Sequence, residues 1–164
     1  MIKELQLDIK RNEKKFPQIP ILFLYRLGNK INYDINNKFL KNIILIPFKI
    51  LYKFCLGLFG CEIPLQAKIG GGIRLRHLNG IIINSNTVIG KNCTIFHQVT
   101  IGSLEGKGIN GGAVIKDDVY IGAGAKILGN ICIENDVKIG ANAVVVNDIP
   151  SKSTVFCKST IIKR

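Results

Sequence analysis

Tryptophan is absent from this chain of 164 residues, which also has only one methionine and two histidines. With 47% hydrophobic but only 7% aromatic residues, a narrow core filled by Ile, Val and Ala is expected. The five cysteines show no CxxC or other paired spacing, which argues against a disulfide framework and fits a reducing compartment. The opening stretch, MIKELQLDIKRNEKK, is charged throughout and lacks the apolar segment of a signal peptide. We therefore expect one structural unit with at most a small appendage, located in the cytoplasm.

Acidic residues are also scarce, because 11 Asp and Glu stand against 23 Lys and Arg and leave a net charge of +12. Residues 1–60 hold 11 basic and 4 acidic residues, and so +7 of this charge. Such an excess is typical of a solvated surface, and it would also attract cofactor phosphates or an anionic membrane surface. No helix-turn-helix, zinc-finger or RNA-binding motif accompanies it, so we expect no nucleic-acid partner.

An aliphatic residue returns at every sixth position over most of the chain from Ile63 to Val145. Neither the 3.6-residue period of a helix nor the two-residue period of a flat strand produces this pattern. A short fixed period indicates stacked coils that bury one aliphatic residue after another. Three hexads make one triangular turn, so residues 61–150 are predicted to form a parallel β-helix of about five coils. The markers are Ile63, Ile69, Leu75, Ile83, Ile89, Ile95, Ile101, Ile115, Ile121, Ile127, Ile133, Ile139 and Val145.

Residues 1–60 lack this period and contain two apolar stretches, 19–27 and 39–59. Three lysines and Pro47 interrupt the second stretch, and each charge in mid-bilayer costs roughly 2.5–3.5 kcal/mol, so we do not expect it to span a membrane. Two interpretations remain. Two or three helices pack on the end of the β-helix, or a helical face lies on the inner surface of the cytoplasmic membrane. Residues 151–164 are expected to form a C-terminal tail.

Two insertions interrupt the hexads. Two extra residues lie between Leu75 and Ile83, and about eight lie between Ile101 and Ile115, where residues 103–114 are expected to form a glycine-rich loop. In a rigid solenoid, insertions that bulge from one side are where a site is normally built.

Both histidines occupy the same place in the period. His77 and His97 each follow a marker by two residues, and those markers are one full turn apart once the insertion is counted. We expect the imidazoles on one edge of the prism, about 4.8 Å apart, with Ala123 and Ala141 above them. A neutral imidazole can accept a hydroxyl proton, so both are candidate general bases. Glu62 is the candidate carboxylate to orient His77, or else a solvated side chain on the first coil.

The segments EIPLQAKIGGGIRLRH and ILGNICIENDVKIGANAVVVNDIP resemble the hexapeptide-repeat acyltransferases, in particular the serine acetyltransferase branch. The segment TIFHQVTIG and the basic N-terminal stretch containing YR are more similar to the short exopolysaccharide O-acetyltransferases of the colanic acid type. The resemblance covers residues from about 40 to 155. It implies a left-handed β-helix, acetyl-CoA as acyl donor, no metal, and a homotrimer with active sites between neighbouring prisms.

The resemblance also implies roles for individual residues. His77, oriented by Glu62, would deprotonate the acceptor hydroxyl, and His97 would act as a second base or position the acceptor. Backbone N–H groups near Ser103 could stabilise the oxyanion. The residues implied in binding CoA are Ser103, Ala123, Gly124 and Ala141, with Lys138 near its phosphate-bearing end.

Two positions depart from the serine acetyltransferase pattern. Gly112 stands where that branch has a further active-site His, and Arg76 stands where it has an Asp. We therefore expect a sugar hydroxyl of a surface polysaccharide or its precursor as the acceptor, with L-serine as the alternative. Two other classes stay open. One is a zinc-dependent carbonic anhydrase on the same prism, which needs three His ligands per metal, and the other is a solenoid without catalytic activity.

Overall fold

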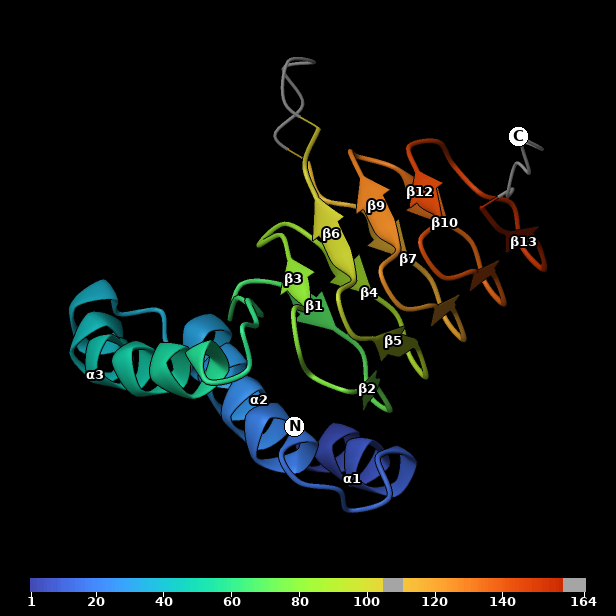
Figure 1. Ribbon diagram of the computed structural model, residues 1–164. Helices are drawn as coiled ribbons and strands as arrows, with labels where there is room; N and C mark the ends of the chain where they lie inside the picture. The colour runs from blue at the N-terminus through green and yellow to red at the C-terminus, as the bar shows by residue number, and fades with distance from the viewer. Residues whose placement is uncertain (105–110, 158–164) are drawn as a thin grey trace, which may run out of the picture.

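The computed structural model describes residues 1–104 and 111–157, in which three α-helices precede a stack of short parallel strands (Figure 1). The helices are α1 (Ile2–Arg11), α2 (Gln18–Asp34) and α3 (Lys38–Gly57). The strands are β1 (Lys68–Ile69), β2 (Arg74–Arg76), β3 (Ile82–Ile83), β4 (Val88–Ile89), β5 (Thr94–Phe96), β6 (Thr100–Gly102), β7 (Val114–Ile115), β8 (Tyr120–Ile121), β9 (Lys126–Leu128), β10 (Cys132–Ile133), β11 (Lys138–Ile139), β12 (Val144–Val145) and β13 (Thr154–Val155).

Successive strands along the chain belong to three different sheets, which form the three walls of a prism. The orders are β1-β4-β7-β10, β2-β5-β8-β11-β13 and β3-β6-β9-β12, with every pair parallel. The marker residues lie in register from coil to coil, as Ile95 does with Ile121 and Ile101 with Ile127. The predicted left-handed parallel β-helix is therefore confirmed.

The interior of the prism is a column of aliphatic side chains. Ile95, Ile101, Ile121 and Ile127 have no exposed surface, because each strand turns its marker inward and its neighbours outward. Burying one such side chain contributes ~1.5–3 kcal/mol, and the same contribution repeats in every coil. The small residues four positions after a marker fill the corners, as Cys93 does with an exposed fraction of 0%.

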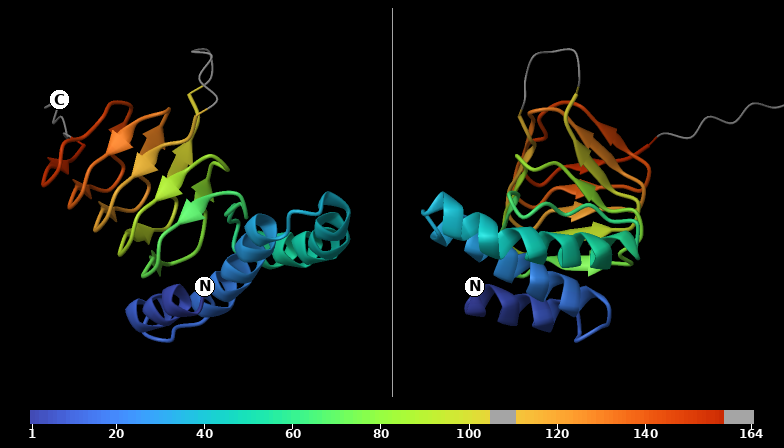
Figure 2. Two further views of the ribbon diagram at one scale, coloured as in Figure 1. Left: turned by 180° about the vertical axis from the view of Figure 1, so that it is seen from behind. Right: turned by 90° about the vertical axis from the view of Figure 1, so that its left-hand side faces the viewer.

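The three helices cover the end of the prism that carries β1, β2 and β3 (Figures 1 and 2). Tyr25 on α2 donates a hydrogen bond to the carbonyl oxygen of Ala67 at 2.7 Å, and Tyr52 on α3 donates to that of Ile63 at 2.9 Å. Helices thus pack on the end of the β-helix, as one of the two interpretations of residues 1–60 predicted. Among the described residues, none of the helices combines the length and the apolar character that crossing a membrane requires.

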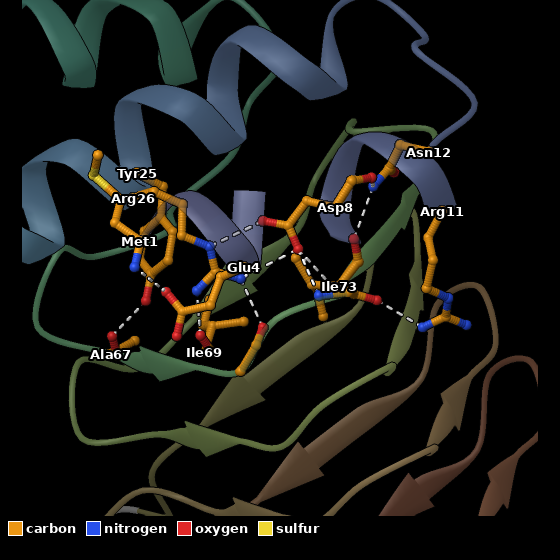
Figure 3. A network of polar contacts seen from close by, with 12 residues as sticks. Met1, Glu4, Asp8, Arg11, Asn12, Tyr25, Arg26, Ala67, Ile69 and Ile73 are labelled. Carbon is orange, nitrogen blue, oxygen red and sulfur yellow. Dashed lines mark hydrogen bonds and ion pairs between the residues drawn. The ribbon is translucent and has the colours of Figure 1, made fainter. Parts of the chain in front are cut away.

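A buried polar cluster, which we call the cap latch, joins α1 and α2 to the first coil (Figure 3). The Asp8 carboxylate accepts hydrogen bonds from the backbone N–H groups of Gly72 (2.8 Å) and Ile73 (2.9 Å). Arg26 forms an ion pair with Asp8 at 2.9 Å and donates to the Gly70 carbonyl at 2.6 Å. Burial raises the pKa of the Asp8 carboxyl, although Arg26 and the two N–H donors oppose this.

Asn12 completes the cap latch at the edge strand β2. Its side-chain amide donates to the Ile73 carbonyl at 2.8 Å and its oxygen accepts from the Leu75 N–H at 2.9 Å. An open sheet edge presents unpaired backbone groups, and the latch gives those of β2 partners. At the other end of the prism, β13 pairs with β11, so the segment expected as a C-terminal tail continues the coil as far as Val155.

Candidate active site

The two histidines lie next to each other on one edge of the prism. His77 follows β2 and His97 follows β5, and these strands pair with Leu75 opposite Ile95. The imidazole centroids are 5.8 Å apart, with the ring planes at 82°. The expected stacking of the two rings in successive coils is therefore present.

The two-residue insertion begins at His77. Register holds up to Arg76 opposite Phe96, and it resumes where the Gln98 N–H donates to the Asn79 carbonyl at 2.8 Å. His77 has a φ of +60°, the left-handed conformation with which the chain leaves the regular coil. Its side chain is exposed, whereas that of His97 is half-buried.

His97 has a polar atom with no partner. Its Nδ1 is buried and forms no hydrogen bond within residues 1–104 and 111–157. A buried polar atom without a partner costs ~1–3 kcal/mol, and such atoms call for an explanation in a folded protein. A ligand or a neighbouring subunit that reached this edge could supply the missing hydrogen bond.

Above the histidines the edge is smooth. The Gly124 N–H donates to the His97 carbonyl at 3.0 Å and the Asn142 N–H donates to the Ala123 carbonyl at 2.8 Å, so Ala123 lies over His97 and Ala141 over Ala123. Gly124 has a φ of +73°, and a Cβ there would lie 2.1 Å from Oδ1 of Asn142. The residues at this edge in successive coils are therefore His, His, Ala and Ala, in the order predicted.

Glu62 lies on a different wall from the histidines. It pairs with Ile82 beyond the corner that carries His77, and it lines a groove of about 940 Å³ beside α3. Within the described residues, no hydrogen bond or ion pair joins Glu62 to His77. Its role in orienting His77 remains a prediction.

The predicted CoA-binding residues also fall on more than one edge. Ser103 follows β6 whereas His97 precedes it, and the six residues that separate them can span up to ~20 Å. Ser103 lines the same groove as Glu62. Lys138 opens β11, is exposed, and lies three residues before Ala141 on the histidine edge. Of the expected loop 103–114, residues 105–110 lie outside the described residues.

A cleft that the sequence did not reveal lies beside His77. It has a volume of about 230 Å³ and forms between β2 and the connection from α1 to α2. Its lining residues are Asn12, Glu13, Lys15, Phe16, Gln18, Arg74, Leu75, Arg76 and His77. The N-terminal members are some 60 residues distant in sequence from His77, so the hexad pattern carried no signal for them.

The cleft carries charges of both signs with an excess of positive charge. Lys15, Arg74 and Arg76 face a single carboxylate, Glu13, which forms ion pairs with Lys15 at 2.9 Å and with Arg74. The hydrogen bond from Lys15 and the nearby Arg74 charge lower the pKa of Glu13. Oε1 of Gln18 is buried without a hydrogen-bond partner among the described residues. A small polar molecule that carries both an anionic and a cationic group would find complementary partners here.

Gly112 is fixed by packing. A Cβ at this position would lie 2.5 Å from backbone atoms of Asn86 and Thr87. Real Cβ atoms essentially never approach so closely, so the backbone leaves no room for the histidine of the serine acetyltransferase pattern.

Comparison with known proteins places these features in a family. Residues 112–147 match the family model for the bacterial transferase hexapeptide, six repeats. The serine acetyltransferase of Helicobacter pylori strain 26695 is 37% identical over 139 residues, which are 85% of this chain and 77% of the relative. The first matching relatives, from Buchnera aphidicola, rice and Arabidopsis thaliana, are longer, and the chain spans only 28 to 31% of their length.

Solved structures similar to this chain are also serine acetyltransferases. Neisseria gonorrhoeae serine acetyltransferase in complex with serine is 30% identical with a TM-score of 0.72, over 93% of this chain and 65% of that one. The Brucella abortus serine acetyltransferase in complex with coenzyme A is 25% identical with a TM-score of 0.75, over 94% and 64%. These findings contradict the sugar hydroxyl of a polysaccharide as acceptor and favour the alternative, L-serine. The likeness of TIFHQVTIG to the colanic acid type was therefore misleading, because that segment belongs to the coil rather than to the cleft.

Proposed function

Because the chain belongs to the serine acetyltransferase family of hexapeptide-repeat acyltransferases, we propose that it transfers the acetyl group of acetyl-CoA to the hydroxyl of L-serine. The relatives at 37% and 30% identity carry this name, and one of them was solved with serine bound. The feature of this chain that carries the proposal is the charged cleft beside His77, which fits a zwitterionic amino acid.

The cleft offers one partner for each group of serine. The carboxylate of serine would bind Arg76 and Lys15, since guanidinium and ammonium groups form charge-assisted hydrogen bonds with carboxylates. The ammonium of serine would bind Glu13, the carboxylate of the cleft. The hydroxyl would then point to His77. In this chain Glu13 supplies the negative charge that the serine acetyltransferase pattern places at position 76.

The chemistry follows from that placement. His77 accepts the hydroxyl proton as the serine oxygen attacks the thioester carbonyl of acetyl-CoA. The tetrahedral intermediate collapses, the C–S bond breaks, and the CoA thiolate takes the proton back from His77. No covalent enzyme intermediate is needed, because the thioester is already an activated acyl donor. The imidazole of His97, whose centroid is 5.8 Å from that of His77, would lie beside the reacting carbonyl.

Acetyl-CoA would lie along the smooth part of the histidine edge. Ala123 is half-buried and Ala141 exposed there, and their small side chains leave the surface smooth enough for a thin pantetheine chain. Lys138 is exposed beside this track and would attract the phosphates. The excess of basic residues over the whole chain acts in the same direction.

We also propose a homotrimer that works in the cytoplasm. Ser103 and Glu62 lie on another wall than the histidines, so a single prism does not bring all predicted site residues together. In the proposed threefold arrangement, the histidine edge of one prism would lie beside the Ser103 wall of the next. The unpartnered Nδ1 of His97 on that edge supports such a junction. Light scattering of the purified protein tests the trimer directly.

The experiment on substrate choice uses serine and two truncated analogues. Release of CoA from acetyl-CoA is followed with L-serine, with 3-hydroxypropionate, which lacks the amino group, and with serinol, which lacks the carboxylate. We expect turnover with L-serine, and losses in kcat/KM of about tenfold or more for each analogue because one charged contact between substrate and cleft is lost. Arg76→Gln should raise KM for L-serine while it changes serinol turnover little, and Glu13→Gln should show the converse pattern with 3-hydroxypropionate.

Two outcomes would overturn the proposal. One is turnover of free monosaccharides at a rate above that of L-serine. The other is equal turnover of serine and both analogues, because the cleft would then not recognise an amino acid.

A further inference from the structure

The outer face of α3 is the largest cluster of exposed apolar side chains among the described residues. Nine of the exposed large hydrophobic side chains lie on this helix or directly after it: Phe39, Leu40, Ile43, Ile44, Ile46, Ile50, Leu51, Phe54 and Leu58. Ile50 is 67% exposed and Phe39 is 76% exposed. Single exposed hydrophobic residues need no explanation, but a contiguous cluster of this kind marks an interaction surface.

This face is separate from the one that packs on the protein. Leu45, Tyr52 and Leu56 are buried against α2 and the first coil. At 100° per residue, the exposed residues occupy a continuous sector of about 160° on the other side of the helix. α3 lies on the outside of the helical cap, at the end of the molecule away from β13 (Figures 1 and 2). A flat surface can therefore approach this face without meeting the prism.

The charges on α3 itself are all positive. Residues 35–61 contain four lysines and no acidic residue. Lys53 is exposed and lies next to Ile46 at one border of the apolar sector, and the half-buried Lys49 lies on the same side of the helix. Lys38 is exposed in the first turn of α3. Lys41 donates to the Asn32 carbonyl at 2.6 Å and so faces the protein. A second copy of the chain would bring the same positive border against itself, whereas an anionic surface would complement it.

We propose that the outer face of α3 binds the surface of an anionic phospholipid bilayer, with the helix axis in the membrane plane. Apolar side chains on one sector and lysines at its border are the features of helices that bind in this way. Each lysine near an anionic bilayer strengthens binding by about fivefold at moderate ionic strength. The inference does not depend on the acceptor of the enzymatic reaction, and it predicts a membrane-associated acetyltransferase rather than a freely diffusing one.

Sedimentation with vesicles tests the proposal on the full chain. The protein is mixed with vesicles of phosphatidylcholine alone, and with vesicles that contain about 30% phosphatidylglycerol, at about 0.1 M and about 0.5 M salt. We expect binding to the anionic vesicles, little binding to the neutral ones, and at least about fivefold weaker binding at the higher salt because the charges are screened.

Matched variants locate the binding surface. Ile50→Glu should abolish vesicle binding, whereas Phe156→Glu, which changes the charge equally at a side chain that is 73% exposed, should leave it intact. Lys38→Gln with Lys53→Gln should weaken binding by more than tenfold, and the exposed pair Lys91→Gln with Lys116→Gln should not. Circular dichroism verifies that each variant is folded.

Three results would overturn the proposal. The first is that the wild type does not bind anionic vesicles, and the second is that Ile50→Glu binds them as well as the wild type does. The third is that the outer face of α3 joins copies of the chain: light scattering would then give a lower molar mass for Ile50→Glu than for the wild type, and the wild type would not bind vesicles.

Discussion

Replacing Asp8 by alanine should detach the helical cap from the β-helix. Asp8 has no exposed surface, and its carboxylate is the anionic partner of Arg26, whose side chain is only 4% exposed. The substitution leaves the guanidinium buried with carbonyl partners alone, and it strips the N–H groups of Gly72 and Ile73 of their acceptor. Breaking a buried ion pair in this way costs ~3–5 kcal/mol, a large share of the ~5–15 kcal/mol that stabilises a typical domain.

The loss should be local rather than global. In a solenoid each coil contacts only its neighbours, so the upper coils keep their own interfaces when the cap is lost. Hydrogen exchange followed by mass spectrometry should show strong deprotection of residues 2–34 and of the first coil in Asp8→Ala, with peptides from residues 119–145 unchanged. Guanidinium unfolding should show an early transition that the wild type lacks.

A matched control separates the cap latch from ordinary surface charge. Asp34 pairs with Lys30 on the same helical cap, but at 3.8 Å and with both side chains more than half exposed. Asp34→Ala should cost no more than about 0.5 kcal/mol. If Asp8→Ala costs as little as Asp34→Ala, or if its exchange pattern matches the wild type, the reasoning about the cap latch is refuted.

Three further predictions concern the histidine edge and the thiols. His97→Ala should lower turnover with saturating acceptor by at least about tenfold, measured as CoA release, and a rate near wild type would contradict its role. Gly124→Ala should destabilise the protein by at least ~1 kcal/mol in guanidinium unfolding, because its φ is +73° and a Cβ would meet Asn142, so unchanged stability would contradict the geometry. Burial raises the pKa of Cys93 to about 11, whereas Cys157 is exposed. Because the thiolate is the reactive form, iodoacetamide at pH 8 should label Cys157 and spare Cys93, and labelling of Cys93 in folded protein should rise only as pH approaches 11. Mass mapping of the labelled peptides would show the reverse order if the burial were wrong.

The coils were predictable because one residue type recurs at a fixed spacing. Ile95, Ile101 and Ile121 lie where the hexads placed them, and the neighbouring histidines followed from the same count. The packing of the helices was predictable only in outline. Asp8 meets Gly72, and Arg26 meets Gly70, across more than 40 residues of sequence, and no period links such partners.

The acceptor could not be predicted for the same reason. The hexads fix the edge on which His77 lies, but the cleft beside it is completed by Glu13 and Lys15 from the connection between α1 and α2. The position of that connection depends on the hydrogen bonds of the cap latch, which fix α1 and α2 against β2. A motif within the coils, such as the one around His97, therefore carries information on the fold rather than on the molecule that enters the cleft.

The central claim is that His77 takes the proton from the hydroxyl of L-serine. The most direct test is the formation of O-acetyl-L-serine from acetyl-CoA and L-serine, measured by mass spectrometry in parallel for wild type and His77→Ala. We predict product with the wild type and a loss of roughly a hundredfold or more with the variant, while CoA binding is retained. Equal product with both proteins, or no product with the wild type while another hydroxyl compound is acetylated, would contradict the account.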